Sequence, residues 1–219
     1  GFPCQSVSQA NQRARGSDGS SGLFEQVKEI VQAVRTNNPR AEFIIENVDF
    51  RRHSPAFFDY VSESLESVPV ILCADVVAPC RRRRAFWASF PIQALVERVA
   101  NPEGVLGSGR TTLWKKLPTI MASGVTSWGM REVVYDEQGN LGPLSIEEME
   151  RAMGVPASFT AVAGLSFQDR CRCVGNAFQA DVIRHVLLCY AAAKAIIHRD
   201  DVRQEGVIFT ITGDGPTWP

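Results

Sequence analysis

Residues 43–48 read Phe-Ile-Ile-Glu-Asn-Val, an apolar, β-prone run that ends in a polar pair before the valine. This run predicts a buried strand, and further strands are predicted at residues 70–72 and 85–88. Around these strands, apolar residues recur at helical spacing over residues 23–34 and 55–65. Strands that alternate with helical patterns are typical of an α/β fold, so we predict a sheet with helices on both faces.

The second half of the chain is organised differently. From residue 92 to 143, glycines and prolines interrupt every pattern, which predicts a small, loop-rich insert. Helical patterning returns at Ser145, where Glu148 completes a capping-box signature, and a last long helix is predicted over residues 179–197. The predicted units are residues 1–91 and 144–198 of one α/β domain, the insert at 92–143, and a tail at 199–219.

The composition is that of an ordinary globular protein of 219 residues, with 45% hydrophobic and 21% charged residues and a formal net charge of -1. Such a chain carries no global basic field, so binding to nucleic acid would require a local basic patch. The six cysteines and three histidines lack the spacing of a zinc site or a disulfide scaffold, which favours a reducing, intracellular compartment and no metal. No apolar run approaches the ~20 residues that cross a bilayer, so we expect no membrane partner.

Three separated segments carry candidate chemistry, although each has a plain structural alternative. In Gly1-Phe2-Pro3-Cys4-Gln5-Ser6, a cysteine follows a proline within a predicted loop, which suits an accessible nucleophile, yet most free cysteines are buried. Glu46-Asn47 follows an apolar strand, where α/β proteins bind ligands, but a helix cap or a solvated strand end would look the same. Arg82 and Arg84 share one face as they enter a strand, and such a run is also typical of a solvated or phosphate-binding surface.

The order and spacing of these segments together resemble the cytosine-5 DNA methyltransferase family over most of the chain. Residues 1–8 resemble its Pro-Cys nucleophile loop, and Gly22-Leu23-Phe24 resembles the segment that follows. Glu46-Asn47-Val48 matches the Glu-Asn-Val motif of the family, and Arg82-Arg83-Arg84 matches its Gln-x-Arg-x-Arg motif, with Cys80 in place of the glutamine. Residues 144–156 resemble the family's Leu-Thr-Pro-x-Glu-x-x-Arg-x-x-Gly-Phe-Pro stretch, and Gly175-Asn176-Ala177 matches its closing Gly-Asn-Ala motif. The segments that resemble the animal de novo type within this family are residues 84–87, 148–151 and 182–185.

This resemblance implies a Rossmann-like, S-adenosylmethionine-dependent sheet, here without its first strands, and a small target-recognition lobe. It implies that Cys4 adds to carbon 6 of a cytosine flipped out of double-stranded DNA, which prepares carbon 5 for a methyl group. Glu46 would protonate ring nitrogen 3, and Arg84, supported by Arg82, would contact the ring carbonyl oxygen. Further substrate contacts are expected from Pro3, Gln5, Ser6, Asn47, Arg110, Lys115 and Lys116. The residues expected to line the cofactor are Gly175, Asn176 and Ala177.

In this family, most of the cofactor pocket comes from segments that precede the Pro-Cys loop, and this chain begins at that loop. We therefore expect the chain to start mid-protein, to lack most of its S-adenosylmethionine site, and to bind this cofactor poorly alone. Turnover would need a longer chain or a partner chain that supplies the missing strands. The resemblance to animal enzymes favours the nucleus, or the cytoplasm if the organism is not a eukaryote.

Several alternatives remain open from the sequence. The chain could be a non-catalytic relative that binds DNA or regulates a partner, and its substrate could be RNA rather than DNA. A hydrolase built on Cys4 and a histidine is disfavoured, because it would leave Glu46 and Arg84 without a role. In the insert, Trp114 and Trp128 could stack on bases, although a place in the small-lobe core is the stronger expectation.

Overall fold

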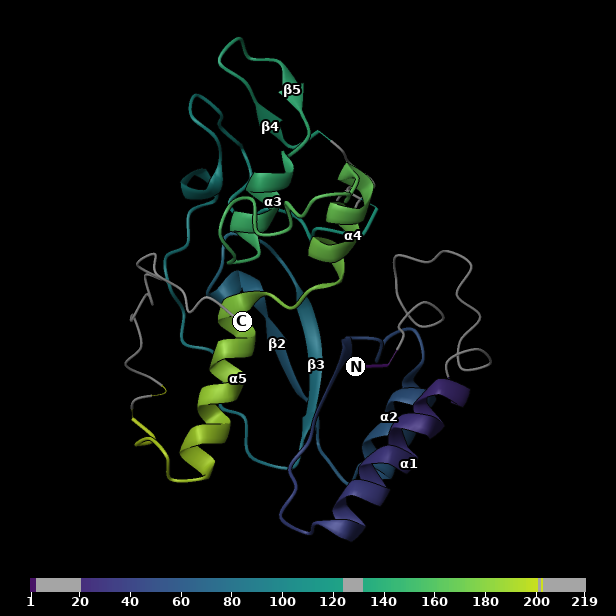
Figure 1. Ribbon diagram of the computed structural model, residues 1–219. Helices are drawn as coiled ribbons and strands as arrows, with labels where there is room; N and C mark the ends of the chain where they lie inside the picture. Colours follow the sequence, from purple (N-terminus) through teal and green to yellow (C-terminus); the bar gives the residue numbers. More distant parts are fainter. Residues whose placement is uncertain (3–20, 124–131, 201, 203–219) are drawn as a thin grey trace.

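The computed structural model describes residues 1–2, 21–123, 132–200 and 202, and a three-stranded sheet lies at its centre (Figure 1). β3 lies between the other two strands and pairs antiparallel with both, so β1 and β2 run parallel to each other. The predicted strands are therefore confirmed. Their bounds are Ile44–Val48 for β1, Val70–Cys73 for β2 and Arg83–Ala88 for β3.

Helices cover both faces of this sheet, as the sequence predicts. α1 (Ser21–Asn37) and α2 (Pro55–Ser64) lie on one face, and α5 (Ala180–Ala193) lies on the other (Figure 1). Alternate side chains of β3 point to opposite faces, so Trp87 packs beneath α1 and α2 whereas Phe86 packs beneath α5. Both side chains are at most 1% exposed, which shows that β3 is buried on both sides.

Aromatic rings fill the first of these faces, and Phe2 lies among them. Phe2 is buried, and its ring centroid lies 5.2 Å from that of Phe24 and 6.2 Å from that of Phe57. Edge-on ring pairs of this kind stabilise a fold by about 0.5–1.5 kcal/mol beyond the effect of their burial. The first two residues of the chain are therefore anchored in the core beside β1, which contributes Ile45 to the same cluster.

A second lobe lies above the sheet in Figure 1 and carries short elements, among them the 3-10 helix η3 (Pro102–Val105), two strands and two α-helices. Their bounds are Val134–Tyr135 for β4, Leu141–Gly142 for β5, Ile146–Ala152 for α3 and Phe167–Asn176 for α4. The core of this lobe draws apolar side chains from both sides of residue 143, among them Leu117, Val133, Ile146 and Val174. The boundary expected at residue 143 thus falls inside a packed cluster, and the functional division at that point stays a prediction.

α4 is absent from the predicted helices, because its sequence Phe-Gln-Asp-Arg-Cys-Arg-Cys-Val-Gly-Asn has too few apolar residues to show a helical period. A local signal marks its start: Ser166 accepts a hydrogen bond from the N–H of Asp169, and the Asp169 carboxylate accepts one from the N–H of Ser166. The same reciprocal arrangement joins Ser145 and Glu148 at α3, where the sequence predicts it correctly.

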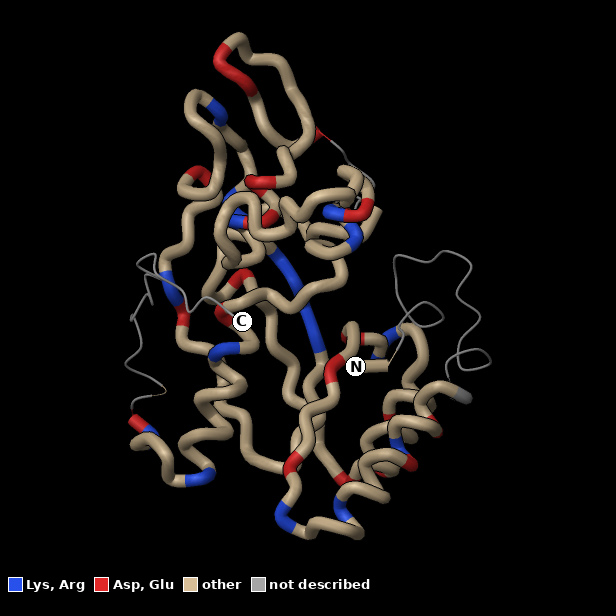
Figure 2. The backbone as a smooth tube through the Cα atoms, viewed as in Figure 1, with Lys and Arg blue, Asp and Glu red and all other residues tan. Residues whose placement is uncertain are grey.

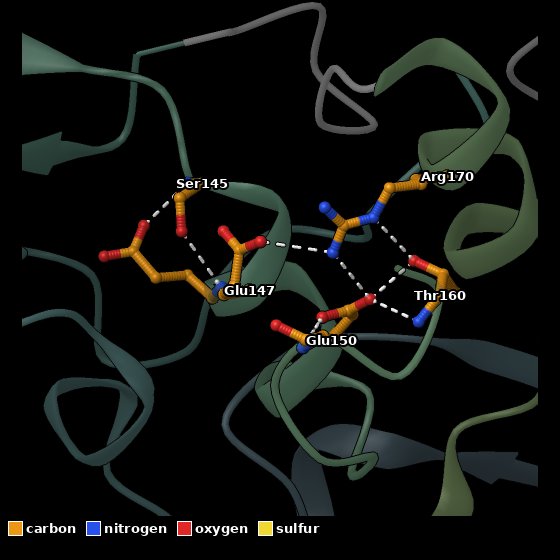
Figure 3. Close-up of polar contacts among 7 residues, drawn as sticks. Ser145, Glu147, Glu150, Thr160 and Arg170 are labelled. Carbon is orange, nitrogen blue, oxygen red and sulfur yellow. Dashed lines mark hydrogen bonds and ion pairs between the residues drawn. The ribbon is translucent and has the colours of Figure 1, made fainter. Parts of the chain in front are cut away.

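Buried carboxylates tie the second lobe together (Figure 3). Glu150 is fully buried and accepts hydrogen bonds from the N–H groups of Ser158, at 2.6 Å, and Thr160, at 2.8 Å. The Arg170 guanidinium lies 3.1 Å from Glu150 and 3.1 Å from Glu147. Burial alone would raise the pKa of Glu150, but the Thr160 and Arg170 contacts outweigh burial and lower the pKa. Glu150 is therefore a structural anion.

In the part of the chain that the structure describes, no helix is both long and apolar enough to cross a bilayer. The same ranges hold no group of three or more histidine, cysteine or carboxylate side chains that could bind a metal ion.

Candidate active site

Glu46 and Arg84 form an ion pair on the sheet face that α5 covers. In the register of β1 and β3, Glu46 lies opposite Phe86 and Arg84 lies opposite Val48, so the two are diagonal neighbours on one face. Arg84 Nε lies 2.9 Å from Glu46 Oε1, and the two side chains are 15% and 17% exposed. Because water is partly excluded, this attraction is screened less than that of an open surface pair. The structure thus brings together two of the predicted catalytic residues.

Arg82 precedes β3 on the same face and connects the sheet to the second lobe. Its side chain is buried, and it donates to the carbonyl oxygens of Gly175, at 3.0 Å, and Ile120, at 3.4 Å. The sequence predicts that Arg82 supports Arg84. The structure gives it a further role, because its guanidinium reaches two segments of the other lobe.

Asn47 joins the first residues of the chain to β1. Its Nδ2 donates to the carbonyl oxygen of Phe2 at 3.0 Å, and its Oδ1 accepts from the N–H of Val48 at 2.8 Å. Asn47 is 2% exposed, so both ends of its amide are engaged within the protein. The predicted contact of Asn47 with substrate stays a prediction, whereas its contact with Phe2 is observed.

Gly1 approaches the backbone of β1 so closely that a side chain would not fit. A Cβ on Gly1 would lie 2.6 Å from the carbonyl oxygen of Glu46 and 3.3 Å from its carboxylate. The glycine at this position therefore allows the chain to pass directly beside the Glu46–Arg84 pair.

A small pocket adjoins the ion pair and encloses about 230 Å³ of space that is open to solvent. Its polar side is formed by Glu46, Arg82 and Arg84, and its apolar side comes from β3 and the start of α5. Phe178 and Gln179 also line it and were not among the predicted site residues. Gln179 is buried as the N-cap of α5, with its Oε1 accepting from the N–H of Val182. Their only sequence signal is that they follow Gly-Asn-Ala directly.

The predicted cofactor residues lie where α4 ends. Gly175 packs so tightly that a Cβ would lie 2.2 Å from the backbone nitrogen of Ala122, whereas Asn176 and Ala177 are exposed. The predicted contact of these three residues with S-adenosylmethionine stays a prediction.

The basic residues predicted to contact DNA in the insert differ in their surroundings. Arg110 Nε lies 3.0 Å from the buried Glu148 carboxylate, and Lys116 donates to the carbonyl oxygens of Ala78 and Ala100, at 3.0 and 3.1 Å. These two side chains therefore hold the lobe itself together. Lys115 is exposed.

The remaining predictions fall partly outside the described residues. Trp114 packs against the second-lobe core, in line with the structural alternative weighed for it. Pro3, Cys4, Gln5 and Ser6 lie outside the described residues, as does Trp128. The predicted nucleophile therefore stays a prediction.

The segment that contains β1, β3 and the Glu46–Arg84 pair matches a known family. Residues 1–92 match the family model of C-5 cytosine-specific DNA methylases. This match covers 92 of the 219 residues of the chain. In the DNA (cytosine-5)-methyltransferase DRM1 of Arabidopsis thaliana, 68 residues are 35% identical to this chain, covering 29% of this chain and 11% of the relative. The chain thus matches only about a tenth of that protein.

Solved structures of methyltransferases have the same fold. The methyltransferase EhMeth of Entamoeba histolytica has a TM-score of 0.62 at 15% identity, covering 87% of this chain and 75% of that chain. DNMT2 of Spodoptera frugiperda has a TM-score of 0.57 at 13% identity, covering 86% and 77%. Dnmt2 of S. pombe has a TM-score of 0.54 at 15% identity, covering 81% and 74%. These likenesses establish a mixed α/β fold of the Dnmt2 type.

Proposed function

We propose that this protein is a cytosine-5 methyltransferase that acts on carbon 5 of cytosine in double-stranded DNA through a covalent intermediate on Cys4. The observation that carries the proposal is the hydrogen bond from Asn47 to the Phe2 carbonyl, beside the Glu46–Arg84 pair. It joins the start of the Pro-Cys segment to the strand that bears the predicted acid. The fold and the family support the same activity.

Covalent geometry limits how far the nucleophile can be from the ion pair. Two peptide units separate Phe2 from Cys4, and consecutive Cα atoms are about 3.8 Å apart, so the two Cα atoms lie within roughly 7.6 Å of each other. Phe2 itself is held against β1 by Asn47 and by the aromatic cluster. The proposal requires the Cys4 sulfur to meet a base that lies beside Glu46 and Arg84, and this bound is compatible with it.

The proposed reaction begins when the Cys4 thiolate forms a bond to carbon 6 of the flipped cytosine. The electron pair of the C5–C6 double bond forms a C4–C5 double bond, and the C4–N3 pair moves to nitrogen 3, which takes a proton from protonated Glu46. When the carbon 5 proton is later lost, the double bond re-forms, the Cys4 thiolate leaves, and nitrogen 3 gives up its extra proton. The methyl group would come from S-adenosylmethionine.

The Glu46–Arg84 pair holds both side chains in place before the base arrives. On insertion of the ring, Arg84 would turn its guanidinium to the carbonyl oxygen at carbon 2, while Glu46 takes up a proton from solvent and donates it to nitrogen 3. The partly buried guanidinium then lies beside the ring as negative charge develops there. The residues 92–143 are proposed to contact the DNA around the flipped base.

A trapping experiment tests the nucleophile without requiring the methyl donor. Duplex oligonucleotides would carry 2-pyrimidinone in place of cytosine in several sequence contexts. This base lacks the electron-donating amino group, so carbon 6 accepts a thiolate more readily. The wild-type chain is expected to form a protein–DNA adduct that survives denaturation with detergent. The measurement is the shifted band on a denaturing gel.

The matched variants are Cys4→Ser and Cys173→Ser, which remove a predicted nucleophile and an exposed cysteine of the second lobe. Cys4→Ser is expected to abolish the adduct, whereas Cys173→Ser should leave it unchanged. An adduct that persists in Cys4→Ser, or that never forms with wild-type protein, would overturn the proposed mechanism.

A further inference from the structure

A cluster of exposed arginines lies where β1 ends and β3 begins, and the activity proposed above does not use it. Arg51 and Arg52 occupy the turn after β1, and Arg83 is the first residue of β3. All three are exposed, and Asp49 lies between Arg51 and Arg83. In Figure 2 the blue start of β3 runs toward this end of the sheet. These residues are called the Asp49 cluster below.

Asp49 holds two guanidinium groups in fixed positions. Arg51 makes a two-pronged contact, with Nε 2.9 Å from Oδ1 and Nη2 2.9 Å from Oδ2 of the carboxylate. Arg83 Nε lies 2.7 Å from the same Oδ2. Arg51 is also stacked on Phe58, with its central carbon 5.7 Å from the ring centroid. Exposed arginines are rarely held by this many contacts, and two of them here are ordered before any ligand binds.

The electrostatics of the cluster favour an anion. Two guanidinium groups share a single carboxylate and Arg52 adds a third positive charge, so the cluster stays positively charged although the whole chain has a formal net charge of -1. The turn leads directly into α2, whose first turn contains no acidic residue and whose N-cap Ser54 makes no side-chain capping bond. Like charges gathered at the positive end of a helix are unfavourable unless an anion offsets them.

The cluster lies next to the candidate active site but on the other side of β3. Arg83 and Arg84 are neighbours, and Arg84 Nη1 donates to the Arg83 carbonyl oxygen at 2.8 Å. Because successive side chains of a strand alternate, Arg84 faces the pocket while Arg83 faces Asp49. A nucleotide held at the Glu46–Arg84 pair would therefore have its flanking backbone within reach of the Asp49 cluster.

We propose that Arg52 and Arg83, together with Arg51 held on Asp49, bind the phosphates of duplex DNA that flank the target nucleotide. This inference rests on the proposed function for its choice of DNA, but it concerns binding and not catalysis. Planar guanidinium groups suit phosphate oxygens, because each can donate two parallel hydrogen bonds. Such contacts carry no sequence information; they fix the position of the backbone and make binding depend strongly on salt.

The test is a binding titration of the full chain with a fluorescent duplex oligonucleotide, followed by anisotropy at several salt concentrations. The variant is Arg52→Gln/Arg83→Gln, which keeps Arg51 on Asp49. Loss of two phosphate contacts should lower the slope of log K against log salt by about 2 and weaken binding roughly 50-fold at 0.1 M salt. Arg52→Lys/Arg83→Lys keeps both charges and is expected to bind within about 5-fold of wild type.

The matched control is Arg35→Gln/Arg40→Gln, which removes two exposed charges at the opposite end of the same sheet. If this control loses as much affinity as the cluster variant, the effect is one of net charge and the inference is wrong. It is also wrong if wild-type protein does not bind duplex DNA, or if the variant loses affinity only for an RNA hairpin. A different outcome is that the cluster variant shows the expected loss of salt-dependent DNA binding while wild-type protein forms no adduct at Cys4. That outcome would contradict the proposed mechanism but would still support this inference.

Discussion

At the scale of single residues, pairs of side chains from different strands determine the candidate site. Glu46 and Arg84 neutralise each other on one face of the sheet, and Asp49 meets Arg83 on the other. Asn47 contributes neither charge nor nucleophile, yet its buried amide connects Phe2 to β1. Asn47→Ala would remove the buried donor to the Phe2 carbonyl oxygen and should lower the free energy of unfolding by about 1–3 kcal/mol.

The carboxylate of Asp49 should make the stability of the protein depend on pH. The hydrogen bond from Arg51 and, after the opposing effect of burial, that from Arg83 lower the pKa of Asp49 from 3.8 to about 2. A depressed pKa stabilises the folded state above about pH 4, and this contribution is lost as the pH falls from about 4 to about 2. At about 1.4 kcal/mol per pKa unit, it amounts to about 2 kcal/mol.

Urea unfolding of wild-type and Asp49→Asn protein at pH 7, 4 and 2.5 measures this contribution. We expect Asp49→Asn to be less stable by about 2 kcal/mol at pH 7 and the difference to shrink toward zero at the lowest pH. A difference that stays constant across this range would show that the carboxylate charge does not carry the stabilisation.

At the scale of elements, the contact between α4 and the loop at residues 120–122 locks the second lobe beside the site. Gly175 permits this contact, since its backbone lies against that of Met121 and Ala122. Both α3 and α4 begin with capping boxes. Arginines from other segments pair with the acidic residues of α3, whereas Asp169 of α4 pairs with Arg172 of the same helix. The position of α4 therefore depends on close backbone packing more than on its apolar face.

Gly175→Ala is expected to lower the free energy of unfolding by about 1–3 kcal/mol or more. The reason is that a Cβ would lie 2.2 Å from the Ala122 backbone nitrogen, so one of the two backbone segments would have to move. The matched control is Gly104→Ala, where no atom lies within 4 Å of the added carbon. That control should stay within about 1 kcal/mol of wild type. The measurement is chemical denaturation, and equal stability of the two variants would contradict the packing described for α4.

At the scale of the whole molecule, polar contacts join the sheet to the second lobe, and Arg82 makes two of them. It reaches Ile120 and Gly175, which are far from it in the sequence. Because the Arg82 side chain is buried, removal of its guanidinium would leave both carbonyl oxygens without this hydrogen-bond donor.

Arg82→Gln should therefore lower the free energy of unfolding by about 2–4 kcal/mol, since a hydrogen bond to a charged group contributes about 1.5–3 kcal/mol and the one to Ile120 is long, at 3.4 Å. Amide hydrogen exchange should become faster at residues 120–122 and 175, where the lobe meets the sheet. Arg40→Gln, at the far end of the sheet, should change stability by less than about 0.5 kcal/mol. If Arg82→Gln unfolds like wild type, the two lobes are held together by other contacts.

Much of the candidate site could be predicted from residue types alone. Glu46, Arg82 and Arg84 were singled out by their place at strand ends and by the motifs around them, and the structure places them around one pocket. Phe178, Gln179 and the Asp49 cluster were missed, because a capping glutamine and a shared carboxylate carry no pattern in the sequence. The intramolecular contacts of Arg110 and Lys116 were missed for the same reason, and the contact of these residues with DNA stays a prediction.

The sequence by itself determined the three strands, the helices on both sides of them and the order of the family's motifs, because apolar periodicity and short motifs are local properties of a chain. Only the tertiary structure decided that Glu46 meets Arg84, that Asn47 holds Phe2 and that Arg82 reaches the second lobe. Those contacts depend on strand register and on packing between distant segments, and a single residue of slip in register would have moved each side chain to the opposite face.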